Sequence, residues 1–413
     1  MNCKERILAA WNGQPADYVP LSTWCFGFPA APQLRWRRGG REVTYWYSGR
    51  LEHIHTLPQP WTVEDDFRRV LAWRLLGVDD VLDVSVPWST DPEVTHQDTR
   101  LPAGAPGGDL QYPVMVREYR TPEGRLSHAV RATGEYQGAG WVVQPGYVPL
   151  FEDYNIPRGV KHALGAPAEV PVIKYLYRAP DAEARAWFAS RMESVHRFAE
   201  DEQVPVQAWS AFGMDGVVWL TGVQGAILMA MDEPAAFGQL VDLVAETDLA
   251  RTELAAAHPG VDMVVERGWY SSTDFWSPRL FDAFVFPHLK ELAAVAHRHG
   301  KRFGYTMTTG IKTLGRRLAD AGVDVLYFVD PVQDRLPLEI ARDLLSDRVT
   351  LVGGTNALTL ASGDMRRIRE EVCRAIEVLG PTRRFILQPV DALFPDTPWE
   401  SVAQLIAAWK EYR

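Results

Sequence analysis

Glu266 opens a segment whose residue types could carry out proton transfer. The segment reads ERGWYSSTDFWSP and combines an acid, an arginine and several aromatic residues. A carboxyl group that Trp269 and Tyr270 partly shield from water would have a raised pKa and could act as a general acid or base. The alternative is that Glu266 and Arg267 pair with other loops and serve the structure alone. The sequence leaves both interpretations open.

A second segment, QLRWRRGGREVTYW, could bind an anion. It places Arg35, Arg37, Arg38 and Arg41 around two glycines and between aromatic residues. A planar guanidinium can hold a carboxylate or phosphate through two hydrogen bonds, and neighbouring rings could stack on a flat ligand. Arginine clusters are also common on solvated surfaces, which is the alternative for this segment.

Metal and nucleotide motifs are scarce. His53 and His55 have a spacing that could hold a metal ion, although isolated pairs of this kind are usually structural. The sequence contains no G-x-G-x-x-G, P-loop, G-x-S-x-G or C-x-x-C motif. The commonest dinucleotide, nucleoside triphosphate, serine hydrolase and dithiol chemistries are therefore not indicated.

A third set of polar residues follows short apolar runs, where strands are expected to end. In KRFGYTMTTG, alternation with a period of two separates a bulky face from a small hydroxylic face. The bulky face holds Phe303, Tyr305 and Met307, and the small face holds Gly304, Thr306 and Thr308. The small face could bind a ligand through its hydroxyl groups, or the threonines could simply favour a strand. The other expected strand ends carry Trp209, Ser210, Glu266, Arg267, Asp330, Asn356, Gln388 and Asp391.

These residues must be positioned by alternating strands and helices. From about residue 180 onward, helical patterns alternate with short apolar runs, which is typical of βα units and a parallel sheet. We therefore predict an α/β fold, a (β/α)8 TIM barrel with N-terminal loop and β-hairpin elaborations. In such a barrel the residues at the carboxyl ends of the strands form the site.

The N-terminal part is less regular. Residues 111–131 read as a β-hairpin insertion around the turn TPEG. Residues 22–61 and 133–160 are rich in Trp, Tyr, Gly and Pro without periodicity, and we expect them to lie over the barrel mouth. With no repeat or linker in the sequence, we predict one domain over residues 1–413.

The amino-acid composition limits the classes of binding partner and the cell compartment that we expect. The formal net charge of -10 and pI near 5.5 argue against binding to nucleic acid or an anionic membrane, so a small-molecule substrate is expected. Three cysteines far apart in the sequence argue against a disulfide framework and favour a reducing compartment. No apolar run is long enough to span a bilayer, and a cytoplasmic protein is expected. Whether it forms a homodimer is left open.

Several longer segments carry a family resemblance. They resemble the uroporphyrinogen decarboxylase and corrinoid methyltransferase superfamily at both ends and over most of the C-terminal half. The segments are KERILAAWNGQPADYVPL, REYRTPEGRLS, WSPRLFDAFVFPHLKELAAVAHRHGKRF, LADAGVDVLYFVDP, DRVTLVGGTN and FILQPVDALFPDTPWESVAQLIAAWKEY. The resemblance implies a (β/α)8 barrel with its ligand in the mouth. The reactions that it implies range from porphyrinogen decarboxylation to methyl transfer that involves a corrinoid and a thiol or methoxy compound.

The sequence departs from both branches of this superfamily. The methyltransferases usually hold zinc with a His-x-Cys pair and a further Cys, and those positions are matched here by Thr306, Thr308 and Asp391. Threonine cannot replace a thiolate or imidazole ligand, so we expect no zinc and no other cofactor. In the decarboxylases an arginine-glycine motif directly follows the first strand. Here the first strand reads PLSTWCFGF and RRGGR comes later. Glu266 falls on an acidic position of the family.

The leading hypothesis is a metal-free lyase, a decarboxylase of an anionic substrate that is tetrapyrrole-like or aromatic. Glu266, Tyr270 and Asp391 would provide proton transfer and charge stabilisation. A corrinoid-dependent methyltransferase or O-demethylase, with a corrinoid protein as partner, is the second hypothesis, and a non-catalytic ligand-binding barrel is the third. The expected substrate contacts are Arg37, Arg38, Arg41, Trp269, Tyr305, Thr306, Thr308, Asp330, Asn356 and Gln388.

Overall fold

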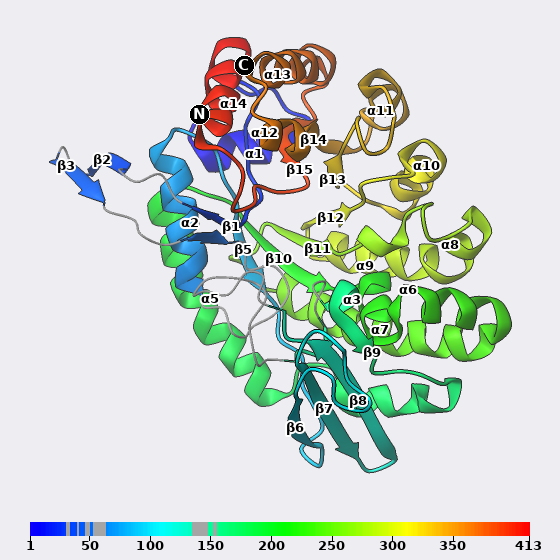
Figure 1. Cartoon of the computed structure of the whole chain (residues 1–413). Coiled ribbons are helices and arrows are strands. Elements are labelled where there is room, and N and C mark those ends of the chain that lie inside the picture. Colours follow the sequence, from blue (N-terminus) through cyan, green and yellow to red (C-terminus); the bar gives the residue numbers. More distant parts are fainter. Residues whose placement is uncertain (30–33, 39–40, 46–49, 53–62, 134–147, 152–154) are drawn as a thin grey trace.

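The centre of the molecule is a parallel sheet of seven strands (Figure 1). The structure is a computed structural model that describes residues 1–29, 34–38, 41–45, 50–52, 63–133, 148–151 and 155–413. The strands lie side by side in their chain order, which is the arrangement that successive βα units produce. They are β5 (Leu82–Ser85), β10 (Val206–Ala211), β11 (Met263–Glu266), β12 (Arg302–Thr306), β13 (Val325–Val329), β14 (Thr350–Asn356) and β15 (Phe385–Val390).

The sheet is curled. Tyr327 on β13 donates a hydrogen bond to Gln207 on β10 at 2.5 Å, although two strands separate them in the sheet. Side chains of such distant strands meet only when the sheet bends around them. The concave side, which we call the inner face, therefore holds Gln207, Trp209 and Tyr327. Beyond β15, Leu21 and Cys25 make parallel bridges to Leu387 and Leu393, so the chain near residues 20–25 runs beside this edge.

Helices cover the convex side of the sheet (Figure 1). The helix α10 has Ile311, Leu314 and Leu318 buried on one face and charged residues on the other, so its apolar stripe packs on the sheet. The main helices are α1 (Cys3–Trp11), α2 (Val63–Leu75), α5 (Ala182–Glu202), α6 (Gly213–Asp232), α7 (Pro234–Ala256), α8 (Pro278–Phe284), α9 (Phe286–Arg298), α10 (Ile311–Ala321), α11 (Leu338–Leu345), α12 (Ala357–Ser362), α13 (Met365–Leu379) and α14 (Trp399–Tyr412).

A second, antiparallel sheet stands apart from the parallel one (Figure 1). It has the strand order β6 (Thr95–Leu101), β7 (Val114–Thr121), β8 (Gly124–Arg131) and β9 (Gly159–Lys161). The residues expected to form a hairpin are the β7–β8 pair, closed where Thr121 faces Gly124. Two short antiparallel pairs lie inside a segment expected to be loop, and apart from Phe28 they are described by their backbone alone. They are β1 (Phe26–Pro29) with β4 (Arg50–Glu52), and β2 (Leu34–Arg38) with β3 (Arg41–Tyr45).

Two helix starts lie next to prolines. The segment after Ser277 forms two helices, α8 and α9, because the helix breaks at Val285 and Pro287 lies in the first turn of α9. The last helix begins at Trp399 after Pro398, and the Thr397 side chain does not cap it. The Thr397 hydroxyl instead accepts a hydrogen bond from the Phe394 backbone N–H.

One helix is apolar enough for a bilayer by composition. Within the described part of the chain, only α6 meets the length and hydropathy of a membrane span, and 67% of that window is buried inside the fold. Such burial is typical of a core helix in a water-soluble protein.

Candidate functional site

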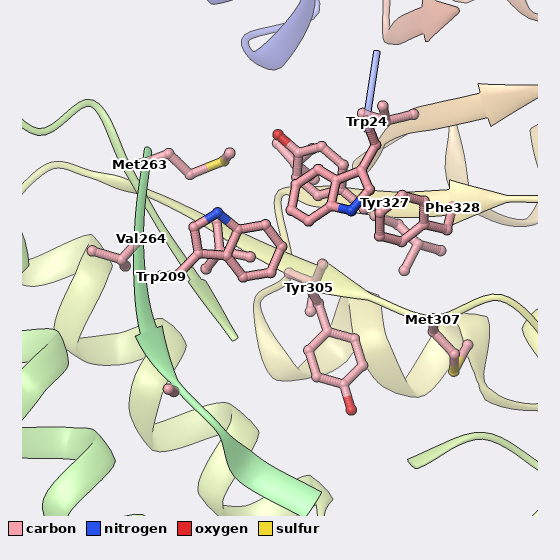
Figure 2. Close-up of a cluster of buried hydrophobic side chains, with 14 of the residues drawn as sticks. Trp24, Trp209, Met263, Val264, Tyr305, Met307, Tyr327 and Phe328 are labelled. Atoms are coloured by element: carbon pink, nitrogen blue, oxygen red, sulfur yellow. The ribbon is translucent and has the colours of Figure 1, made fainter. Parts of the chain in front are cut away.

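Four aromatic side chains meet on the inner face near the carboxyl ends of the strands. Trp24, Trp209, Trp269 and Phe328 form this group, which we call the aromatic floor. Figure 2 shows Trp24, Trp209 and Phe328 of this group. The ring centroids of Trp24 and Trp209 lie 5.0 Å apart. Those of Trp269 and Phe328 lie 5.1 Å apart, and the Trp209 and Trp269 planes are within 12° of parallel at 6.2 Å. The floor joins residues from β10, β13, the loop after β11 and the segment beside β15.

Phe328 reaches the floor through an unusual backbone. Its φ of 69° lies in the left-handed region, which costs a bulky residue roughly 1–3 kcal/mol. The pairing of β13 with β14 is irregular between Tyr327 and Val329, at the same place. The irregularity brings the Phe328 ring within 5.6 Å of Trp24, so it supports the floor.

A buried acid lies directly beneath the floor. Asp83 on β5 accepts hydrogen bonds from the Trp209 indole N–H at 2.7 Å and from the Gln207 amide at 2.5 Å. The Tyr327 hydroxyl extends the network by donating to Gln207. The network thus connects three strands through buried polar groups. Asp83 was not predicted as a site residue, although an acid inside the apolar run VLDVSV was a signal for a buried polar site.

Arg69 on α2 places a positive charge among three buried carboxyl groups. Its guanidinium lies 2.9 Å from Asp66, 2.5 Å from Asp80 and 3.1 Å from Asp83. Burial raises the pKa of Asp80 to about 6. Burial and the nearby Asp66 raise the pKa of Asp83 well above its usual range. One guanidinium thus lies among three buried carboxyl groups, and the pKa values of Asp80 and Asp83 are raised.

The small hydroxylic face of β12 lies on the inner face. A Cβ on Gly304 would meet Met263 and Val265, which are paired in register with Gln207 and Trp209. Thr306 is on the same face, and its hydroxyl oxygen accepts a hydrogen bond from the Gly268 backbone N–H at 2.8 Å. This contact holds the loop that carries Trp269.

Glu266 and Tyr305 lie on the opposite face, toward the helices. They are register partners on β11 and β12, and Tyr305 shares a short hydrogen bond with Ser271. Glu266 lines a cavity of about 20 Å³ with Asp248 on α7 and His288 on α9. Burial, together with nearby Asp248 and Asp215, raises the pKa of Glu266 well above its usual range. Across the described part of the chain, its Oε2 atom has no hydrogen-bond partner. The two charges that raise this pKa, Asp248 and Asp215, belong to α7 and α6.

Asp330 and Asn356 are brought together and bond to each other. The Asn356 amide donates to Asp330 at 2.6 Å, and the other Asp330 oxygen accepts from the backbone N–H groups of Val332 and Gln333. Burial raises the pKa of Asp330. These contacts shape the loop after β13. They involve both carboxyl oxygens of Asp330 and the side-chain amide nitrogen of Asn356.

Gln388 has a polar atom without a partner. A Cβ on Gly354 would meet Phe385 and Ala375 of α13, so Phe385 faces the helices. Alternation along β15 then places Gln388 on the inner face. Its Oε1 atom is buried and has no hydrogen-bond partner within the described residues. It is available to a ligand.

The remaining predicted residues lie at the same edge of the sheet or beyond it. Asp391 follows β15 and is half-buried, and Thr308 follows β12 and is buried. Tyr270 is half-buried, its backbone N–H donates to Asp215 at 2.9 Å, and its carbonyl accepts from Trp276. Glu266 is on the helix-facing side, Tyr270 belongs to the loop after β11, and Asp391 belongs to the loop after β15. Asp215 is a neighbour of both Glu266 and Tyr270. Their catalytic roles remain predictions.

Some predicted positions fall outside the described residues. The backbones of Arg37, Arg38 and Arg41 belong to β2 and β3, but their side chains are not described. His53 and His55 lie outside as well. Among the residues that the structure does describe, no three His, Cys, Asp or Glu side chains gather in a way that could hold a metal ion.

The fold defines a class of α/β protein with a curled parallel sheet of seven strands. The chain belongs to the uroporphyrinogen decarboxylase (URO-D) family, whose model matches residues 185–412. The match begins in α5 and includes the strands from β10 to β15.

Comparison with solved structures supports the fold. A methyltransferase from Methanosarcina mazei is similar with a TM-score of 0.56 and 17% identity, covering 100% of this chain and 99% of that protein. A 3-keto-D-glucoside 4-epimerase from E. coli has a TM-score of 0.35 and 15% identity, covering 54% of this chain and 85% of that protein. The second likeness is too small to support an argument. No curated protein matches the chain.

Proposed function

We propose that the protein is a metal-free decarboxylase of the URO-D family, acting on a flat carboxylated substrate that contains one or more aromatic or pyrrole-type rings. The proposal includes a sheet that closes into a (β/α)8 barrel, with the segment beside β15 in the eighth position. It also includes a cytosolic location and no bound cofactor. The observation that carries it is the aromatic floor above the buried Asp83 network.

The floor suits a flat ring system. Aromatic rings attract one another in stacked or edge-on arrangements worth about 0.5–1.5 kcal/mol beyond burial. Gln388 adds a buried acceptor for a ring N–H group at the inner face. The described arginines on this side, Arg69 and Arg267, are already paired with Asp83 and Asp215. The substrate carboxylates would therefore be held by Arg37, Arg38 and Arg41.

Decarboxylation needs charge stabilisation and one proton. The bond between a ring substituent and its carboxylate breaks, carbon dioxide leaves, and a proton takes its place on the carbon. Tyr270 and Asp391, in the loops after β11 and β15, are the proposed proton donors. Thr306 and Thr308 offer no thiolate or imidazole, which supports a reaction without zinc. Glu266 would act from the helix-facing side only through other groups.

A corrinoid-dependent methyltransferase is the second candidate. The whole-length structural likeness to the Methanosarcina mazei methyltransferase supports it at the level of the fold. In that case a corrinoid protein would dock over the mouth, and a methoxy substrate would be activated by protonation. A homodimer is compatible with either function.

Carbon dioxide release tests the leading proposal. The purified protein is incubated with carboxylated tetrapyrroles and with ring-containing aromatic acids, and carbon dioxide is measured. We expect turnover, and we expect Trp269→Ala to raise the KM about tenfold because one stacking surface is lost. The matched control is Trp409→Ala, which removes a buried indole far from the inner face.

The alternatives give different results. If neither class of acid releases carbon dioxide, the decarboxylase proposal is wrong. A change in the cobalt absorption spectrum of methylcobamide on addition of the protein would favour the methyltransferase. Ligand binding without turnover, unchanged by Glu266→Gln and Asp391→Asn, would favour a non-catalytic barrel.

A further inference from the structure

The loop Arg267–Ser271, which we call the Trp269 loop, determines where one ring of the aromatic floor lies. It follows β11 and contains a single 3-10 turn, Trp269–Ser271. The Trp269 ring is close to Trp209, Trp24 and Phe328. A small movement of this loop would therefore open the floor.

Two side chains hold the backbone on either side of Trp269. The Gly268 N–H donates to the Thr306 hydroxyl at 2.8 Å, and the Tyr270 N–H donates to Asp215 at 2.9 Å. Thr306 comes from β12 and Asp215 from the start of α6, so two independent elements hold the residues that flank the indole. Both side chains are fully buried, and water cannot easily replace either contact.

Arg267 links the same anchors to the indole itself. Its guanidinium lies 3.3 Å from Asp215 and 4.5 Å from the centroid of the Trp269 ring. A second indole, Trp219, lies 4.7 Å from the guanidinium. Asp215 thus fixes the loop backbone with one oxygen and the cation beside the indole with the other.

The position after Arg267 must be a glycine. A Cβ on Gly268 would lie 2.3 Å from the Tyr305 ring and 2.6 Å from the Thr306 carbonyl oxygen. Only a residue without a side chain lets the loop approach β12 closely enough for the Thr306 hydrogen bond. The close approach and the hydrogen bond are therefore parts of one arrangement.

We propose that Thr306 and Asp215 are positioning residues that hold the Trp269 loop so that its indole completes the aromatic floor. Thr306 then acts through Trp269 and does not itself contact the substrate. The consequence for substrate binding rests on the proposed function. The placement of the indole does not, and it can be measured without any substrate.

Fluorine NMR of protein labelled with 5-fluorotryptophan tests the placement. The Trp269 resonance is assigned by its absence in Trp269→Phe. Thr306→Val keeps the shape of the side chain but removes the acceptor, so we expect the Trp269 resonance to shift or broaden. Thr306→Ser restores a hydroxyl and should return the resonance toward its wild-type position. Thr350→Val is the matched control, since Thr350 is a buried threonine with one hydrogen bond, to Ala10.

Hydrogen exchange provides a second measurement. We expect the peptide that contains Gly268 and Tyr270 to exchange about fivefold faster in Thr306→Val than in the wild-type protein. If Thr306→Val does not fold, exchange is measured in the wild-type protein. Slow exchange at the Gly268 and Tyr270 amides supports the proposal, and exchange at the rate of an unprotected loop overturns it. A Trp269 resonance and exchange rate that are unchanged in folded Thr306→Val would also overturn it.

Substrate measurements separate this inference from the proposed function. If the acids are turned over, Thr306→Val should raise the KM severalfold, with a smaller effect on kcat. If they are not turned over while the NMR changes occur, the positioning role stands and the decarboxylase proposal fails.

Discussion

The two faces of the parallel sheet surround a buried carboxyl group in different ways. On the inner face, Asp83 accepts hydrogen bonds from Trp209 and Gln207 and lies beside Arg69. On the helix-facing side, Glu266 lines a small cavity, and no partner for its Oε2 atom is found among the described residues. Burial raises the pKa of both groups. The donors around them differ, and donors decide whether a buried carboxyl group can hold a charge.

The largest effect on the free energy of unfolding is expected when the positive charge of Arg69 is removed from the buried cluster. Arg69→Met should lower the free energy of unfolding by about 3–5 kcal/mol, because Asp66, Asp80 and Asp83 would remain buried without their cation. Urea denaturation measures this change. Arg369→Met, which breaks a surface pair with Glu411, is the control and should change stability little. A loss for Arg69→Met no larger than that of the control would show that the buried cluster does not depend on its arginine.

A smaller effect is expected when only one donor to Asp83 is removed. Trp209→Phe should lower the free energy of unfolding by about 1–3 kcal/mol through the lost hydrogen bond, in addition to the cost of a smaller ring. Trp409→Phe is the matched variant, because its indole N–H donates to a neutral carbonyl, that of Val19. If both variants lose the same stability in urea, the Asp83 contact is no stronger than a neutral one.

The smallest effect, and one of opposite sign, is expected at Glu266. In Glu266→Gln the amide resembles the protonated carboxyl group, so stability at neutral pH should be unchanged or higher than in the wild-type protein. Because the pKa of Glu266 is higher in the native state than in the unfolded chain, the native state binds more protons above about pH 4.3. Wild-type stability relative to the variant should therefore fall as pH rises, by up to about 1.4 kcal/mol per pH unit, until pH exceeds the native pKa.

Urea titrations between pH 5 and pH 8 measure this difference, with Glu253→Gln as a control at an exposed carboxyl group. A wild-type protein that gains stability over the variant as pH rises would contradict a neutral buried Glu266. Loss of activity in a folded Glu266→Gln protein would instead support the catalytic role that the sequence analysis predicted.

The sequence could predict the repeating part of the fold because its apolar runs are continuous. The run ending at Glu266 is β11 and the run KRFGYTM contains β12 almost to the residue, since both strands are buried and flanked by helices with clear apolar stripes. The antiparallel strands outside the β7–β8 hairpin were missed because they lack such runs. β6, for example, is exposed along nearly its whole length.

The candidate site could be predicted only in part. Alternation correctly separates Thr306 from Tyr305, but it does not state which face is concave or what each side chain contacts. Thr306 was expected to contact substrate, which stays a prediction, and the alternation does not show that its hydroxyl oxygen accepts a hydrogen bond from the Gly268 backbone N–H. Asp83 was missed because its partners Gln207 and Trp209 are distant in sequence and meet it only after β5 and β10 pair.

The pairing of β5 with β10 also has a kinetic consequence. The hydrogen bond from Gln207 to Asp83 joins residues 124 positions apart, and the whole antiparallel sheet lies between them in the chain. The other neighbours in the parallel sheet are joined by much shorter connections, and closing a long loop costs more entropy than closing a short one. We therefore expect the strands from β10 to β15 to associate first during folding. β5, with Asp83 and the surroundings of Arg69, would be added in a later and slower step.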